Sequence, residues 1–131
     1  MPLTTETRKN IFNKLKNELE KCCPPLVNNK SKADAYEVIG NIPTPYGYKK
    51  VIVPGMYFAS IVARKDNVSF YFFPIYMDYK SYESIAPSLL KYLDGKTCFH
   101  FKKEEQVSVK ELSALLKKGV QSWKKLGYAK W

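Results

Sequence analysis

The segment from Gly55 to Met77 constrains the fold most, because residues that favour β-strands are densest there. Residues 56–64 and 68–73 are mostly aromatic, β-branched or small, and Asp66-Asn67 between them suits a tight turn. Two such strands joined by a turn form a β-hairpin. We therefore expect this hairpin to lie at the centre of a sheet.

The side chains of the hairpin are largely apolar on both faces. Because successive residues of a strand point to opposite faces, the alternation predicts one face with Met56, Phe58 and Val62. It predicts the other face with Tyr57, Ala59, Ile61 and Ala63. Neither set has the polar composition of a surface in full contact with water, so we expect both faces to be at least partly covered.

The length and composition fit one domain. A chain of 131 residues can bury a core without disulfides or metal, since roughly two-thirds of the unfolded surface is hidden at this size. No apolar run approaches the ~20 residues of a membrane span, and residues 1–10 lack the apolar region of a signal peptide. We therefore expect a cytoplasmic protein that does not enter a membrane.

Apolar residues at helical spacing predict three helices, over residues 5–23, 84–93 and 108–126. Thr4 or Thr5 can cap the first helix, and Ser108 to Glu111 has the pattern of a capping box for the last. Further strands are predicted at residues 35–39, 50–53 and 96–101, and residues 26–32 read as a loop.

The fold class expected from these elements is α+β. We predict a single domain of residues 1–131, in which an antiparallel or mixed β-sheet with a central hairpin (about 56–73) is packed by N-terminal, middle and C-terminal helices.

Cysteine and histidine are too few to define a metal or catalytic site. The odd set of Cys22, Cys23 and Cys98 indicates free thiols. His100 is the only histidine, and it shares a predicted strand face with Cys98, but structural zinc takes four protein ligands. The same pair has no identifiable carboxylate to orient it as a nucleophile. We therefore predict no metal, cofactor or catalytic residue, and an enzyme is the less favoured interpretation.

Tyrosines concentrate in and beside the central hairpin and can line a pocket, because each joins an apolar ring to a hydroxyl group. The alternative is that these rings only pack in the core and at its rim. If a pocket exists, the sequence predicts that it is lined by Tyr46, Tyr48, Tyr57, Arg64, Tyr71, Tyr76 and His100.

The net charge of +10 makes the protein strongly cationic. Of the 22 basic residues only Arg8 and Arg64 are arginine, whereas recognition of phosphate and guanine favours the planar guanidinium group. The candidate residues for contact with a nucleic-acid backbone or another polyanion are Lys102, Lys103, Lys110, Lys117, Lys118, Lys124 and Lys125. The alternative is that these lysines form an ordinary solvated helix face.

Three segments carry a family resemblance: 55–60 (Gly-Met-Tyr-Phe-Ala-Ser), 68–74 (Val-Ser-Phe-Tyr-Phe-Phe-Pro) and 95–101 (Gly-Lys-Thr-Cys-Phe-His-Phe). Together with the helix containing residues 115–120, they resemble the uncharacterised bacterial family called YdhG-like, over about residues 27–127. The resemblance implies a small α+β domain that brings no catalytic residues with it. Some members of that family carry a frataxin-like iron-chaperone label, which implies iron delivery and an acidic surface, whereas this chain is basic.

These observations together predict a non-enzymatic cytoplasmic binding or accessory domain whose ligand the sequence does not specify. One alternative is a frataxin-like iron chaperone. The other is a weak nucleic-acid or polyanion binder, with nucleic acid the less favoured partner.

Overall fold

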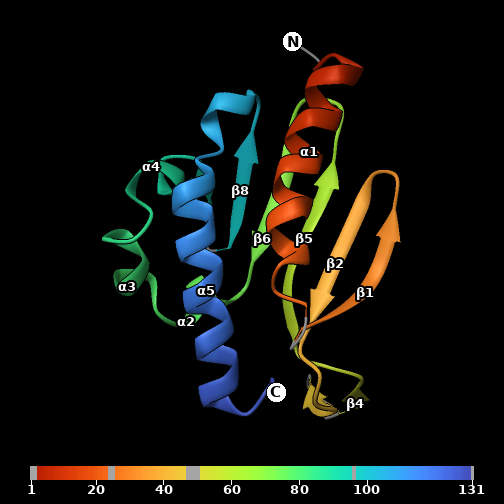
Figure 1. Ribbon diagram of the computed structural model, residues 1–131, viewed down its shortest axis with the longest axis vertical. Coiled ribbons are helices and arrows are strands. Elements are labelled where there is room, and N and C mark those ends of the chain that lie inside the picture. The colour runs from red at the N-terminus through yellow and green to blue at the C-terminus, as the bar shows by residue number, and fades with distance from the viewer. Residues whose placement is uncertain (1–2, 24–25, 47–50, 96, 131) are drawn as a thin grey trace.

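The computed structural model describes residues 3–23, 26–46, 51–95 and 97–130 (Figure 1). The predicted hairpin is present as β5 (Tyr57–Ala63) and β6 (Val68–Phe72). The other strands are β1 (Val27–Lys32), β2 (Ala35–Ile39), β3 (Thr44–Tyr46), β4 (Val51–Val53), β7 (Leu93–Asp94) and β8 (Cys98–Phe101).

Six of these strands form one antiparallel sheet in the order β1-β2-β5-β6-β8-β7. The hairpin therefore lies at its centre, and the predicted α+β fold class is confirmed. The turn comes one residue earlier than predicted, because the Arg64 N–H donates to the Asn67 carbonyl oxygen at 2.8 Å and encloses Lys65 and Asp66. Strands β3 and β4 pair separately as a second hairpin.

The prediction of a loop at residues 26–32 is wrong, because most of this segment is β1. All of its side chains are exposed, as expected for a strand at the edge of a sheet with no covering layer. Such a strand lacks the apolar alternation by which strands are recognised in a sequence. Edge position explains its polar composition Val-Asn-Asn-Lys-Ser-Lys.

Two long helices, α1 (Thr5–Glu20) and α5 (Val109–Leu126), agree with prediction except that α1 ends three residues early. The Thr4 side chain accepts a hydrogen bond from the Thr7 N–H and so caps α1. Gly127, with φ of 85°, ends α5 in the left-handed conformation that glycine adopts without strain. The predicted helix stop at Pro24-Pro25 lies outside the described residues.

The middle helix is shorter than predicted. The segment after β6 forms α2 (Pro74–Met77), α3 (Tyr79–Glu83) and α4 (Pro87–Leu90), and a single turn of 3-10 helix, η1 (Glu104–Gln106), precedes α5. The prediction of a continuous helix over residues 84–93 is therefore wrong. The chain turns at residues 84–86, and α4 ends at Leu90.

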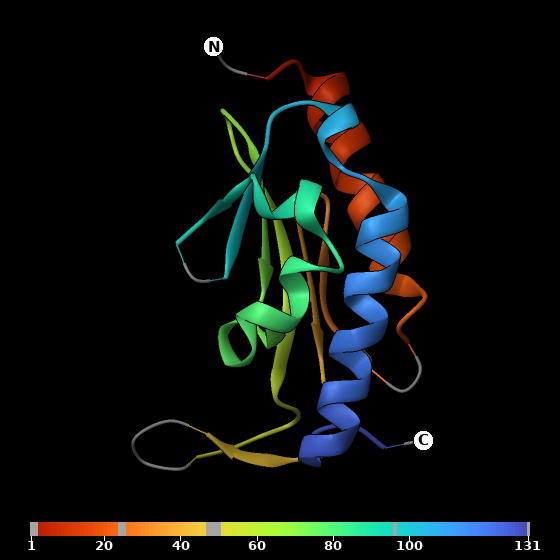
Figure 2. The same cartoon turned by 90° about the vertical axis from the view of Figure 1, so that its left-hand side faces the viewer.

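Figure 2 shows α1 and α5 side by side on one face of the sheet. The core lies between these two layers, and its largest fully buried side chain is Trp123 of α5. The short helices α2 and α4 pack beside α5, next to the β8 side of the sheet (Figure 1). Neither α1 nor α5 reaches the opposite face. In the described part of the chain, no helix combines the length and apolarity needed to cross a membrane.

A β-bulge at Phe58 corrects the predicted division of the hairpin into two faces. Ile39 pairs with Tyr57 and Val38 pairs with Ala59, so Phe58 is an extra residue in β5. Such a residue reverses the alternation at that point. Phe58 and Ala59 therefore both belong to the core, and Tyr57 lies on the face of the sheet opposite the helices α1 and α5.

Candidate functional site

The face of the sheet that is turned away from α1 and α5 carries polar side chains from five strands. Strand pairing aligns one row across the sheet, formed by Glu37, Ser60, Tyr71, Cys98 and Asp94. The neighbouring row contains Val62, Ser69 and His100. On the helix side, the alternate residues of the same strands are apolar side chains that are buried or partly buried. We call the polar side the open face.

Arg64 follows β5 and links these rows through its guanidinium group. Its Nε donates to Ser69 Oγ at 3.0 Å and its Nη2 donates to the Tyr71 hydroxyl at 2.7 Å. Ser69 Oγ in turn donates to Asn67 Oδ1 at 2.8 Å. A guanidinium group has five N–H donors, and these bonds use two of them while holding its plane in place. Arg64 is exposed, so an anion can reach it from solvent.

Tyr57 lies at the other end of the open face, where its hydroxyl is hydrogen-bonded to Ser60 Oγ. Burial raises the pKa of Tyr57 to about 12, although the bond to Ser60 works in the opposite direction. The hydroxyl is therefore neutral at physiological pH and can donate or accept a hydrogen bond. A groove of about 220 Å³ opens beside Tyr57 and Glu37, next to the end of β4 at Val53.

His100 and Cys98 occupy the β8 part of the open face. His100 Nδ1 lies 3.4 Å from Asp94 Oδ2, and both side chains are accessible to solvent. Burial raises the pKa of the Cys98 thiol, and the nearby Tyr71 and Ser69 hydroxyls and the Arg64 charge only partly oppose this. Cys98 is therefore a protonated thiol at neutral pH rather than a thiolate.

The structure brings four of the predicted pocket residues to the open face: Tyr57, Arg64, Tyr71 and His100. Of the other three, Tyr46 is the last residue of β3 and Tyr48 lies outside the described residues. Tyr76 belongs to α2 and lines a different pocket.

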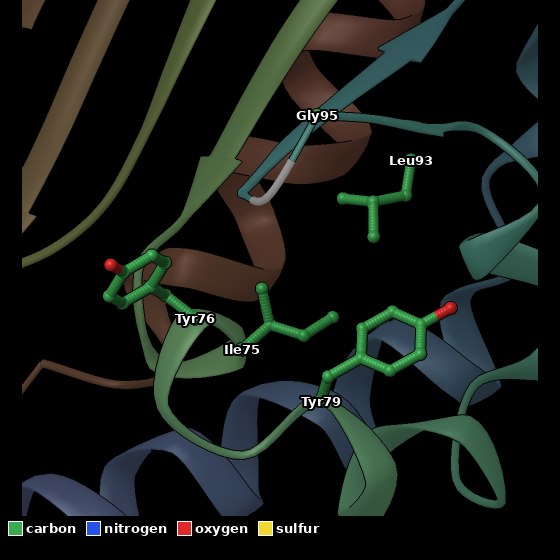
Figure 3. Close-up of a pocket in the computed structure, with 5 residues that line it drawn as sticks. All are labelled: Ile75, Tyr76, Tyr79, Leu93 and Gly95. Carbon is green, nitrogen blue, oxygen red and sulfur yellow. The ribbon is translucent and has the colours of Figure 1, made fainter.

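Figure 3 shows this second pocket, which has a volume of about 490 Å³ and lies between α2, α3 and β7. Ile75 and Leu93 point into it, with the rings of Tyr76 and Tyr79 on either side of Ile75. Both tyrosine rings are about half exposed. The lining is apolar and aromatic, and it contains no charged side chain among the described residues.

The predicted lysines form two groups. Lys110, Lys117 and Lys124 recur every seven residues on α5, a spacing that drifts by only ~20° around a helix, and Lys118 and Lys125 flank them. The only acidic residue of α5 is Glu111, whose carboxylate bonds to the backbone of Ser88 and Leu89. Lys102 and Lys103 lie apart, on the segment between β8 and η1. We call the five α5 lysines the basic face.

Among the described residues, no three side chains of His, Cys, Asp or Glu come close enough together to hold a metal ion. Cys22 and Cys23 lie at the end of α1 as free thiols. Burial raises the pKa of both, that of Cys22 to about 12, with smaller contributions from neighbouring groups.

Several polar residues of the open face were not singled out from the sequence. Ser60, Ser69 and Glu37 enter it only through strand pairing, and the bulge at Phe58 is needed to place Ser60 beside Tyr57. The alternation Val68-Ser69-Phe70-Tyr71-Phe72 was a usable signal, because it puts both polar residues on one face.

No family model matches the chain, and no curated protein or solved structure gives a significant match.

Proposed function

We propose that this protein is a cytoplasmic binding domain, without a reaction of its own, that holds a small organic anion on the open face. The hydrogen-bonded group of Arg64, Ser69 and Tyr71 carries this proposal. A guanidinium group matches the two oxygens of a carboxylate or phosphate. The resemblance to the YdhG-like family is a separate prediction on which this proposal does not depend.

The neighbouring groups define the kind of molecule that fits. The rings of Tyr57 and Tyr71 offer apolar edges beside hydroxyl groups, which suits a planar organic body rather than a bare ion. Glu37 and Asp94 stand at the two ends of the polar row and repel an anion that moves away from Arg64. The ligand class is therefore a monoanion with an aromatic or compact apolar group.

The test is a titration of the ¹⁵N-labelled protein with benzoate, with benzyl alcohol as the uncharged analogue. Benzoate should shift the amide signals of Arg64, Ser69 and Tyr71 in a saturable manner. The Arg64→Gln variant should bind at least about tenfold more weakly, because a hydrogen bond to a charged group contributes roughly 1.5–3 kcal/mol.

Lys65→Gln is the matched control, because it removes the same charge from the adjacent residue, which lies in the exposed turn. If Arg64→Gln and Lys65→Gln weaken benzoate binding equally, the effect comes from net charge alone and the proposal is rejected. Equal binding of benzoate and benzyl alcohol would also reject the proposal.

The basic face of α5 favours a second candidate function, the binding of a polyanion. Its lysines extend over about 22 Å of helix, at 1.5 Å per residue, and the one acidic residue of that helix is engaged by α4. A row of cations of this length can follow a nucleic-acid backbone without reading its sequence. The alternative of iron delivery has no comparable arrangement among the described residues.

Affinity for a short DNA duplex, followed by fluorescence anisotropy between roughly 50 and 200 mM salt, tests this second candidate. Replacement of Lys110, Lys117 and Lys125 by Gln should reduce the slope of log affinity against log salt by about 0.9 for each phosphate that the variant no longer neutralises. The matched control replaces Lys30, Lys65 and Lys91. Binding that is absent, or that both triple variants weaken equally, would exclude the basic face as a binding surface.

A further inference from the structure

A pocket of about 610 Å³ is lined by residues 5–16 of α1, the β1–β2 turn and the end of β5. Figure 1 shows the β1–β2 turn level with the middle of α1. The volume falls within the roughly 300–1,000 Å³ of small-molecule sites. None of the residues predicted for a ligand or polyanion site lines this pocket.

Positive charge dominates the lining. Arg8, Lys9 and Lys16 come from α1 and Lys32 from the end of β1, against a single carboxylate, Asp34. Charges from two separate segments converge here only because the fold brings residue 32 beside residues 8–16. Convergence of like charges in a concave surface raises the local concentration of anions.

One of these cations is already engaged. Lys16 Nζ lies 4.0 Å from Glu20 Oε1 and 5.4 Å from the centre of the Tyr36 ring. Lys9 and Lys32 are exposed and are not held in an ion pair by another described residue. We therefore assign the direct contacts with an anion to Lys9 and Lys32.

Arg8 is fixed in place before any ligand arrives. Its Nη2 donates to the carbonyl oxygens of Leu3 at 3.1 Å and Lys65 at 3.4 Å. Its Nε is buried and has no hydrogen-bond partner among the described residues. A buried donor without a partner is rare in folded proteins and is commonly satisfied by a bound water or ion.

The pocket also has an apolar side. Phe12, only 4% exposed, and Ala63 belong to its lining. An inorganic anion would leave this side in contact with water, whereas a molecule with an apolar group beside its charge would cover it.

We propose that this pocket binds a small phosphate monoester, with the phosphate at Lys9, Lys32 and Arg8 and its apolar group against Phe12 and Ala63. The site is separate from the open face and does not depend on the function proposed for it. Phosphate is favoured over carboxylate because its oxygens can bond to cations on both α1 and β1 at once.

Phenyl phosphate is the probe, with inorganic phosphate and phenol as its two halves. Titration followed by ¹⁵N NMR should shift the amide signals of residues 8–16 and 32–34 and saturate. Phenyl phosphate should bind more tightly than either half. The double variant Lys9→Gln, Lys32→Gln removes two of the cations that line the pocket and should weaken binding by at least about tenfold.

The control double variant, Lys30→Gln with Lys91→Gln, removes the same charge from exposed residues that do not line the pocket. It should bind phenyl phosphate as the unmodified protein does. An equal loss in both double variants, shifts confined to other residues, or no saturation would overturn the proposed site. Equal affinity for inorganic phosphate would overturn the role given to Phe12 and Ala63.

Discussion

Gly119 shows how closely one residue of α5 approaches the sheet. A Cβ at this position would lie 2.7 Å from Phe72 Cζ and 3.0 Å from Phe58 Cε1. Phe72 cannot swing away easily, because its fully buried ring is in edge contact with those of Phe58 and Tyr82. The sequence shows Gly119 within an apolar stripe but not why that residue must be glycine.

We expect Gly119→Ala to lower the free energy of unfolding by about 1 kcal/mol. Overpacking costs roughly 1–3 kcal/mol, and the better helix propensity of alanine returns at most about 1 kcal/mol. Urea denaturation measures this change. Gln121→Ala, on the exposed side of the same helix, should change stability by less than about 0.5 kcal/mol. A stabilised Gly119→Ala protein would contradict the packing described.

Glu111 connects two elements in a way that the capping-box prediction did not anticipate. Ser108 Oγ accepts from the Glu111 N–H at 3.3 Å, as predicted for the cap of α5. The Glu111 carboxylate, however, accepts from the N–H groups of Ser88 at 2.8 Å and Leu89 at 3.2 Å. It therefore caps α4, a helix too short to be stable without tertiary contacts.

Replacement of Glu111 by Ala should destabilise the protein by roughly 1–3 kcal/mol, since two N–H groups at the start of α4 lose a charged acceptor. Ser108→Ala should cost about 1 kcal/mol, the usual value for removal of an N-cap. Hydrogen exchange separates the two effects: only Glu111→Ala should accelerate exchange in α4 (87–90). Equal acceleration there by Ser108→Ala would show that Glu111 acts only through α5.

Most of the elements that could be predicted from the sequence have a buried face, although β4, predicted at residues 50–53, is mostly exposed. β5 and β6 are rich in apolar residues that favour strands and α5 carries a regular apolar stripe, so their existence and type were correct. β1 is polar on both faces, and the two-residue β7 is held by pairing with β8. Their strand conformation depends on a neighbouring strand rather than on their own residues.

The residues of the candidate site divide in the same way, into those with a local sequence signal and those placed only by strand pairing. The density of tyrosine in the hairpin, the presence of Arg64 there and the single histidine on a later predicted strand were enough to single out four residues of the open face. Glu37 and Asp94 could not be assigned to it, because their positions depend on the pairing of β2 with β5 and of β7 with β8. One bulged residue, Phe58, decides which side of the sheet Tyr57 occupies.

At the scale of the whole molecule, the burial of protonated cysteine and tyrosine side chains makes the free energy of unfolding depend on pH in the alkaline range. Burial raises the pKa of Cys22 from 9.0, and those of Tyr57 and Tyr82 from 10.0, to about 12 in each case. Below about pH 8 these groups are protonated in both the folded and the unfolded chain and do not make stability depend on pH. Above that value the unfolded chain loses protons first, so the free energy of unfolding falls as pH rises.

Each such group lowers the free energy of unfolding by about 1.4 kcal/mol per pH unit between its unfolded and folded pKa. Lysine deprotonation over the same range complicates the total, so the test compares the protein with Cys22→Ala, which has the same lysines. At pH 8 the variant should be less stable by about 1 kcal/mol, because a buried side chain is truncated. This difference should shrink as pH rises above 9 and reverse before pH 11, since only the unmodified protein is destabilised, by about 1.4 kcal/mol per pH unit, through ionisation of Cys22 in its unfolded chain. Urea denaturation across that range measures the difference, and a gap that stays constant would show that the thiol ionises as readily in the folded protein as in the unfolded chain.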